Sequence, residues 1–501
     1  MNDGKKISLN FILGILSEVL TIVLGVLIPR FMLTGYGSEV NGLITSVTQI
    51  YGYIGLVEAG IGMAALQGLY KTVGNKDRQA TNEILSATNI YYHRTGYIYM
   101  AVIGVFAVVY PLVIKTDIPV ITIILVILFN GAGSVINFFF QGKYFILFQA
   151  EGKNYIGISL NMATNVFKNI AKIILIHQGF DIVFVQAIAM VVSLLQMFYV
   201  TYHIKKYYKW IDLKAKPNYS ALSQSKNVLV HQVSGLVFNN TDTILLTFFC
   251  GLKVVSVYSI YTMLFAMIST AISTITQSVV FKLGQTYNTS KEQFIKLFDA
   301  YEVYRTAIVF SLYSVANFFI LPFIKLYTAG VSDINYIDDI LPLLFISTYL
   351  LSSGRNSSSY VIQFAGHFKQ TQWRSILESV INVVVSVIAV HFWGIYGVLI
   401  GTIAALLYRT NDMIIYANKK ILKRNPWYSY RRWLINVAIF IVILFINRFL
   451  TPDLSSYLKI ILWCIPYLAV TLILYFSIVS IVEKQSFRYI WSVVKNKMKK
   501  K

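Results

Sequence analysis

The sequence predicts an all-α integral membrane protein with about 14 transmembrane helices, arranged as two six-helix bundles in parallel repeat plus two C-terminal helices. Three observations predict this class: the composition, the length of the apolar runs and the distribution of positive charge. Of 501 residues, 56% are apolar and 13% are charged, about half the charged share of a typical soluble protein. Apolar runs of about 20 residues, enough for a helix to cross a bilayer core, recur along the chain. A soluble enzyme is therefore excluded.

The apolar runs define fourteen candidate spans. They lie at 9–33, 40–65, 93–114, 119–141, 156–177, 182–204, 228–250, 254–280, 303–323, 339–362, 376–393, 395–417, 433–450 and 458–482. Connections near Gly35, Gly179 and Gly394 are very short, so glycine breakers rather than polar loops separate the spans there. The first run is too long for a signal-peptide core, so we expect it to be an uncleaved span.

The distribution of cations predicts the orientation. With both termini in the cytoplasm, 33 of the 43 Lys and Arg residues fall in cytoplasmic segments and five fall in outer segments. The outer five are Lys115, Lys253, Lys325, Arg448 and Lys459. Such a bias is typical of membrane proteins because positive loops resist translocation. The net charge of +22 is therefore attributed to contact with anionic membrane lipid, and no nucleic-acid partner is expected.

Short motifs recur along the chain at nearly one offset. Tyr202-x-x-Lys205-Lys206 returns as Tyr416-x-x-Lys419-Lys420. Six spans separate the copies, and because that number is even, both halves have the same orientation, as in transporters built from parallel repeats. The alternative is the weak hydropathy symmetry that many polytopic chains share. The predicted divisions are two six-helix bundles at 1–204 and 228–417, a cytoplasmic basic linker at 205–227, a basic loop at 418–432, helices 13 and 14 at 433–482, and a basic cytoplasmic tail at 483–501.

Catalytic and metal-binding motifs are missing from the sequence. GxxxxGK[ST], GxSxG and HExxH do not occur, and Cys250 and Cys464 stand alone in apolar runs. The longest predicted outer loop, 324–338, is too short for a catalytic domain. We therefore expect no enzymatic activity, no metal and no cofactor.

Cations inside spans are the main candidates for function, because a charge at mid-bilayer costs about 2.5–3.5 kcal/mol unless it faces a cavity or a partner. Lys168 and Lys172 share one helical face with Asn161 and Asn165, which predicts a polar stripe that lines a substrate cavity. Snorkelling to the interface is the alternative. Arg30 is placed equally well in the outer interface or in the cavity.

Arg355 lies in a run of serines, and that run predicts a wet path or a packed helix contact. Arg409 has Asp412 one turn later, and an internal ion pair is the favoured interpretation. Three acids inside spans, Glu18, Asp242 and Glu378, are candidates for ion coupling or for structural pairing. For Asp242, structural pairing is the preferred reading.

Several stretches together resemble the polysaccharide or oligosaccharide (Wzx-type) flippases of the multidrug/oligosaccharidyl-lipid/polysaccharide exporter superfamily. They are the glycine-rich stretch from Gly35 to Leu43, Glu58-Ala59-Gly60, Asn240-Thr241-Asp242, and Gly366-His367-Phe368-Lys369-Gln370-Thr371-Gln372-Trp373-Arg374. The likeness covers spans 1–12. It implies two bundles around a central cavity that work by alternating access in the bacterial plasma membrane.

The resemblance also implies a substrate and partners. These are an undecaprenyl-diphosphate-linked oligosaccharide, flipped from the inner to the outer leaflet for capsule or exopolysaccharide synthesis, and the polymerase and glycosyltransferases of that pathway. Arg30 occupies the position of a family cation that meets the diphosphate, whereas Lys168, Lys172 and Arg355 depend on the physical argument alone. The alternatives are a drug or organic-cation antiporter of the same superfamily and, less favoured, a membrane glycan polymerase or ligase.

Overall fold

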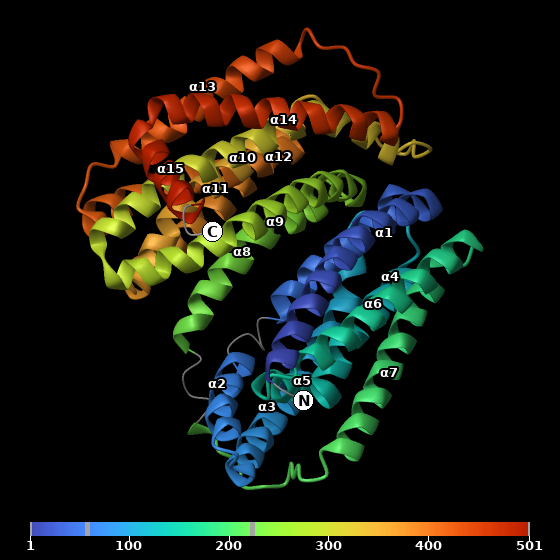
Figure 1. Cartoon of the computed structure of the whole chain (residues 1–501). Coiled ribbons are helices and arrows are strands. Elements are labelled where there is room, and N and C mark those ends of the chain that lie inside the picture. Colours follow the sequence, from blue (N-terminus) through green and yellow to red (C-terminus); the bar gives the residue numbers. More distant parts are fainter. Residues whose placement is uncertain (1–2, 56–60, 221–225, 499–501) are drawn as a thin grey trace. The chain divides into compact units, whose positions relative to one another are not determined.

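The computed structural model describes residues 3–55, 61–220 and 226–498. All regular structure in these ranges is helical, which confirms the predicted all-α class (Figure 1). Nine helices of the described chain are long and apolar enough to cross a membrane. The Glu58-Ala59-Gly60 motif and part of the predicted linker at 205–227 lie outside the described residues.

The chain divides into two compact units, residues 1–259 with 331–334 and residues 260–330 with 335–501. The helices of the first unit are α1 (Asp3–Ile54), α2 (Ile61–Gly74), α3 (Arg78–Val113), α4 (Val120–Ile136), the π-helix η2 (Asn137–Gln141), α5 (Gly142–Ala150), α6 (Asn154–His177), α7 (Ile182–Tyr207), α8 (Lys226–Phe249) and the start of α9 (Leu252–Thr289). The second unit holds the rest of α9, α10 (Lys291–Tyr327), α11 (Leu341–Phe364), α12 (Phe368–Tyr416), the π-helix η4 (Ala417–Leu422), α13 (Trp427–Asn447), α14 (Tyr457–Val482) and α15 (Lys484–Met498).

Twelve of the fourteen predicted spans each coincide with one of these helices or with part of one. The fourth, 119–141, covers α4 and η2, and the second, 40–65, covers the end of α1 and the start of α2, with residues 56–60 between them outside the described ranges. Glycines divide the two longest helices, because Gly37 (φ 81°) interrupts α1 and Gly394 (φ 52°) interrupts α12 with backbone that L side chains disfavour. The first break is at Gly37, two residues after the predicted Gly35. Gly179 (φ 77°) follows the end of α6, as the sequence predicted.

Several helices extend well beyond their apolar cores. The polar start of α3 is capped by Asp77, whose side chain accepts a hydrogen bond from the Ala80 N–H at 3.0 Å, and α10 is capped by Ser290. Hydropathy marks only the apolar part of a helix, so the sequence located these spans but not their ends.

In the first unit, α1 packs along α6 and α4 packs along α7 (Figure 1). The second part of α1 approaches the start of α9 so closely that a Cβ on Gly42 would lie 1.8 Å from the Leu252 carbonyl oxygen. Asn41 donates a hydrogen bond to Ser256 at 2.8 Å beside this contact. Small residues and buried hydrogen bonds therefore hold this helix contact, as is usual for helices in membranes.

In the second unit, α12 folds back on itself at Gly394. Asn382 donates to Thr402 at 2.9 Å across the fold, and a Cβ on Gly397 would lie 2.2 Å from the Ala389 carbonyl oxygen. The predicted spans 11 and 12 are thus the two arms of one tightly closed hairpin. Gly397 and Gly401 allow this closure, because a side chain at either position would meet the opposite arm.

The two C-terminal helices outside the predicted repeat pack on α10. Ser311 of α10 donates to Thr471 of α14 at 3.0 Å, and Ser314 and Tyr475 lie 3.0 Å apart. Figure 1 shows α14 running over α10. The division between compact units falls at residue 259, whereas the predicted repeat boundary lies in the linker at 205–227. Compactness and internal repetition are different properties, so that boundary stays a prediction.

Candidate functional site

The first unit contains the polar stripe that the sequence placed on α6. Its members Asn161, Asn165, Lys168 and Lys172 recur every three or four residues and extend over about 16 Å of helix. Two glutamines of α7 contact the stripe. Gln196 donates to Asn161 Oδ1 at 2.8 Å, and Lys172 Nζ donates to Gln186 Oε1 at 3.4 Å.

The packing of α1 on α6 brings Arg30 to the level of Lys172. The helices run parallel, since Asn10 donates to the Gly152 carbonyl at 3.1 Å near their starts and Tyr36 donates to the Phe180 carbonyl at 2.5 Å near their ends. Partners in these contacts are 142 and 144 residues apart. The same offset places Arg30 beside residues 172–174 of α6. Arg30, Lys168 and Lys172 are three of the four predicted cavity cations, and they therefore lie within about 9 Å of one another along the helix axis.

The two lysines of this level have no neutralising acid among the described residues. Within that part of the chain no carboxylate lies within ion-pair distance of Lys168 or Lys172, and both side chains are half-buried. Of the acids near this part of α1, Glu39 lies beyond the break at Gly37, and the exposed Glu18 lies 12 residues before Arg30, about 18 Å away along the helix. The register of the two helices places it near Asn161, so it does not share the level of the cations.

A cavity of about 610 Å³ begins where the stripe begins. Carboxamide side chains and aromatic rings line much of it, and these include Asn137, Gln141, Gln149, Asn154, Asn161, Tyr92 and Phe145. Carboxamides both donate and accept hydrogen bonds, so this lining suits a polar, uncharged ligand with many hydroxyl groups.

The π-helix η2 shapes one wall of that cavity. It supplies Asn137 and Gln141, and π-bulges in α-helices frequently mark functional sites. Gln141 is only 5% exposed, and its Oε1 atom has no hydrogen-bond partner within the described structure. The next residue, Gly142, touches the Tyr92 ring, because a Cβ there would lie 2.6 Å from Tyr92 Cε2.

Lys143 is a buried cation that sequence reasoning missed. It lies two residues beyond the predicted end of the fourth span and was therefore assigned to a cytoplasmic segment, but the helix continues through η2 and α5 to Ala150. Lys143 is 4% exposed and donates to the Phe139 carbonyl of η2 at 3.0 Å. A π-helix within an apolar span leaves no clear signal in the sequence.

Asp242 lies in a polar cluster that joins α1, α8 and α9. Its carboxylate is buried and accepts a hydrogen bond from Tyr258 at 2.9 Å. The neighbouring Thr241 hydroxyl lies 2.9 Å from the hydroxyl of Tyr53. These bonds fit the structural pairing that the sequence favoured for Asp242, and its use in ion coupling stays a prediction.

Arg355 and Glu378, both predicted site residues, form an ion pair in the second unit. Arg409 Nε lies 3.4 Å from Glu378, and Arg409 also forms the predicted ion pair with Asp412 at 2.8 Å. Arg374 completes the network through Asp412. Arg355 thus already has a buried carboxylate as partner, unlike Lys168 and Lys172.

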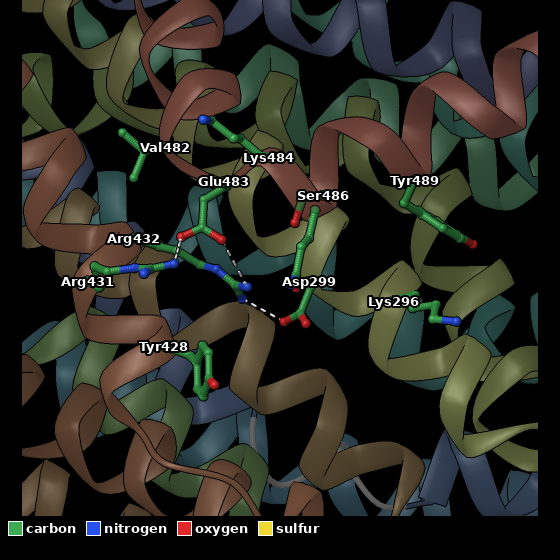
Figure 2. A pocket seen from close by; sticks show the side chains of 11 residues that line it. Lys296, Asp299, Tyr428, Arg431, Arg432, Val482, Glu483, Lys484, Ser486 and Tyr489 are labelled. Carbon is green, nitrogen blue, oxygen red and sulfur yellow. Dashed lines mark hydrogen bonds and ion pairs between the residues drawn. The ribbon is translucent and has the colours of Figure 1, made fainter.

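A second charge network lies at the start of α13. Arg432 contacts Asp299 at 2.7 Å, Glu302 at 2.5 Å and Glu483 at 3.5 Å. Figure 2 shows Glu483 between Arg431 and Arg432 at the wall of a cavity of about 360 Å³. The sequence placed these arginines only as loop cations, because it cannot reveal ion pairs between residues more than 50 positions apart.

The fold is similar to that of solved transporters. A multidrug resistance MATE family transporter of the MOP superfamily in an inward-facing conformation matches with a TM-score of 0.66 and 16% identity, over 80% of this chain and 95% of its own. The lipid II flippase MurJ in an inward closed conformation matches with a TM-score of 0.63 and 13% identity, over 94% and 99%. An outward-facing MATE family transporter matches with a TM-score of 0.55 and 14% identity, over 84% and 97%.

Comparison by sequence adds nothing to this. No protein-family model matches the chain, and no curated protein matches it significantly. At identities of 13–16% the solved structures establish the fold. The chain is thus an all-α membrane protein with the fold shared by MATE transporters and MurJ.

Proposed function

We propose that this protein is a flippase that moves undecaprenyl-diphosphate-linked oligosaccharide repeat units from the inner to the outer leaflet of the bacterial plasma membrane, for capsule or exopolysaccharide synthesis. The observation that carries the proposal is the cation level of the first unit. Arg30, Lys168 and Lys172 lie together there, and neither lysine has an ion-pair partner among the described residues. Buried cations of this kind stabilise a bound anion.

The site suits each part of such a substrate. A diphosphate removed from water needs charged donors, which Arg30 and the two lysines supply. The oligosaccharide needs hydrogen-bonding partners for its hydroxyl groups, which the carboxamide cavity offers. The polyprenyl tail needs no polar group and can stay in lipid. The polar stripe of α6 links the cavity to the cations.

Alternating access is the proposed mechanism. The likeness to MATE transporters and to the lipid II flippase MurJ supports a transporter over an enzyme. We infer that both termini lie in the cytoplasm and that polymerase and glycosyltransferases act on the same glycan. The glycosyltransferases would supply the substrate on the inner leaflet, and the polymerase would consume it on the outer leaflet.

Lys172→Gln tests the proposal in cells that depend on this protein for glycan export. Loss of one charge-assisted contact to phosphate, worth about 1.5–3 kcal/mol, should slow export by about 10- to 100-fold and trap the lipid-linked glycan in the inner leaflet. Accessibility of that glycan to a membrane-impermeant probe measures the effect. Lys115→Gln, which removes an exposed lysine outside the site, is the matched control. Normal export by both Lys172→Gln and Arg30→Gln would refute the assignment of the cations.

A drug or organic-cation antiporter is the second candidate, and the MATE likeness favours it. An organic cation would require an acid at the binding level. Glu18 lies about 18 Å from Arg30 along the helix, and Glu39, beyond the break at Gly37, accepts hydrogen bonds from Thr116 and Asp117. Drug resistance on expression, lost in Glu18→Gln and kept in Lys172→Gln, would support this candidate over the flippase.

A further inference from the structure

The last described helix, α15, is amphipathic and lies against the second unit. It begins directly after Glu483, where the backbone leaves helical geometry at the end of α14. Ser486 is buried on the side that packs on α10. The neighbouring side carries Phe487, Ile490 and Trp491, with Phe487 45% and Trp491 58% exposed. These spacings of three and four residues form one apolar face.

That apolar face closes a groove of about 760 Å³ between three helices. Tyr304 and Ile308 of α10 form one wall, and α14 forms the second from Phe476 to Ile481. Two of the hydroxyl groups in the wall bond to each other, since those of Tyr304 and Ser480 lie 2.9 Å apart, and most of the other lining side chains are apolar. The surface left for a ligand is therefore apolar.

A basic stripe borders the groove on α15. Lys484, Arg488 and Lys495 recur at intervals of four and seven residues, so they share one helical face, and all three are exposed. At 100° per residue this face adjoins the apolar face. Residues 484–501 contain seven Lys and Arg and no Asp or Glu. Of the nearby acids, Glu483 pairs with Arg431 and Asp299 pairs with Arg432 (Figure 2). Asp299 also pairs with Arg424.

We propose that α15 lies in the membrane interface and that this groove binds an anionic glycerophospholipid of the bilayer. One acyl chain occupies the groove between α10, α14 and α15, and the headgroup phosphate contacts Lys484 and Arg488, which are one turn apart. Lys495 lies about 10 Å further along the helix and adds to the attraction for the anionic lipid. Amphipathic helices with a basic border bind membrane surfaces in this way, because apolar burial and attraction to anionic lipid act together. Charge complementarity selects an anionic lipid over a zwitterionic one. The inference does not depend on the transported substrate.

Native mass spectrometry of the full-length protein in detergent, titrated with phosphatidylglycerol, tests the headgroup contact. The triple variant K484Q/R488Q/K495Q should bind phosphatidylglycerol at least about tenfold more weakly than the wild type. K205Q/K206Q/K209Q removes three exposed lysines of the first unit, at the end of α7 and just after it, and should bind like the wild type. Equal binding by the wild type and the α15 variant, or equal binding of phosphatidylcholine, would overturn the proposal.

Fluorescence quenching tests the acyl-chain site. In nanodiscs, phosphatidylglycerol brominated on its acyl chains should quench the tryptophan fluorescence of the wild type more than that of Trp491→Phe. This difference in quenching should be smaller with brominated phosphatidylcholine. No difference between the wild type and Trp491→Phe would refute the groove as the chain site. Displacement of phosphatidylglycerol by equimolar undecaprenyl phosphate would also overturn the proposal, because the groove would then belong to a polyprenyl tail.

Discussion

The buried charges of this protein fall into two kinds. Arg355, Arg374 and Arg409 are held by carboxylates within the second unit. Lys168 and Lys172 have amide neighbours instead, and among the described residues no acid neutralises them. A planar guanidinium suits fixed ion pairs, whereas a lysine on a flexible stem can follow a moving anion. The first kind holds helices together, and the second kind is available for a substrate.

Glu378→Gln should destabilise the second unit without changing side-chain size. Glu378 is 7% exposed and contacts both Arg355 and Arg409, so its loss leaves buried positive charge without its partner. We expect the free energy of unfolding to fall by about 3 kcal/mol. This is at the lower end of the cost of breaking a buried ion pair, because Asp412 still contacts Arg409. Thermal unfolding in detergent measures it.

Glu292→Gln is the matched control for that variant. Glu292 pairs with Lys296 at 2.6 Å on an exposed helix surface, where one ion pair contributes at most about 1 kcal/mol. Equal unfolding midpoints for the two variants would show that the buried network contributes no more than a surface pair.

At the scale of elements, the sequence predicted the polar stripe and its lysines because four polar residues repeat on one face of an apolar helix. It could not predict the carboxamide cavity, because Asn137 and Gln141 reach it through a π-helix that has no sequence signature. For the same reason Lys143 was placed in a loop. The predicted site therefore lacks the residues that the π-helix brings to it, because the sequence shows residue types but not this irregular helix geometry.

Gly142→Val should narrow the carboxamide cavity. A Cβ at this position would meet the Tyr92 ring at 2.6 Å, so the ring or the π-helix must move. Overpacking of this kind costs about 1–3 kcal/mol, and we expect glycan export to fall by at least about tenfold. Export assays on membranes with equal amounts of protein measure the change.

Gly104→Val is the control, because a Cβ on Gly104 would meet no heavy atom within 4 Å other than the neighbouring residues and nearby backbone of its own helix α3. If Gly142→Val exports normally while its unfolding midpoint falls, the cavity wall is structural and does not contact the substrate.

At the scale of the whole molecule, hydropathy and charge together predicted the helices. Fourteen apolar runs became helices or parts of helices, and the glycine breaks at Gly179 and Gly394 lie where the short connections indicated. The packing of α13 and α14 on α10 could not be predicted, since it depends on hydrogen bonds such as Ser311 to Thr471 that join residues far apart in the chain.

The transmembrane orientation can be tested with single cysteines in a chain whose Cys250 and Cys464 are replaced by alanine. The split of 33 cytoplasmic to five outer cations predicts that Lys115→Cys and Lys459→Cys react with a membrane-impermeant maleimide on intact cells. Lys209→Cys and Lys423→Cys should react only after permeabilisation. All four lysines are exposed, so differences in labelling report the side of the membrane rather than burial.

Ten predicted spans separate Lys115 from Lys459, an even number, so labelling of only one of the two would contradict the span count and with it the parallel repeat. If only Lys209→Cys and Lys423→Cys react on intact cells, the orientation of the whole protein is the opposite of the predicted one.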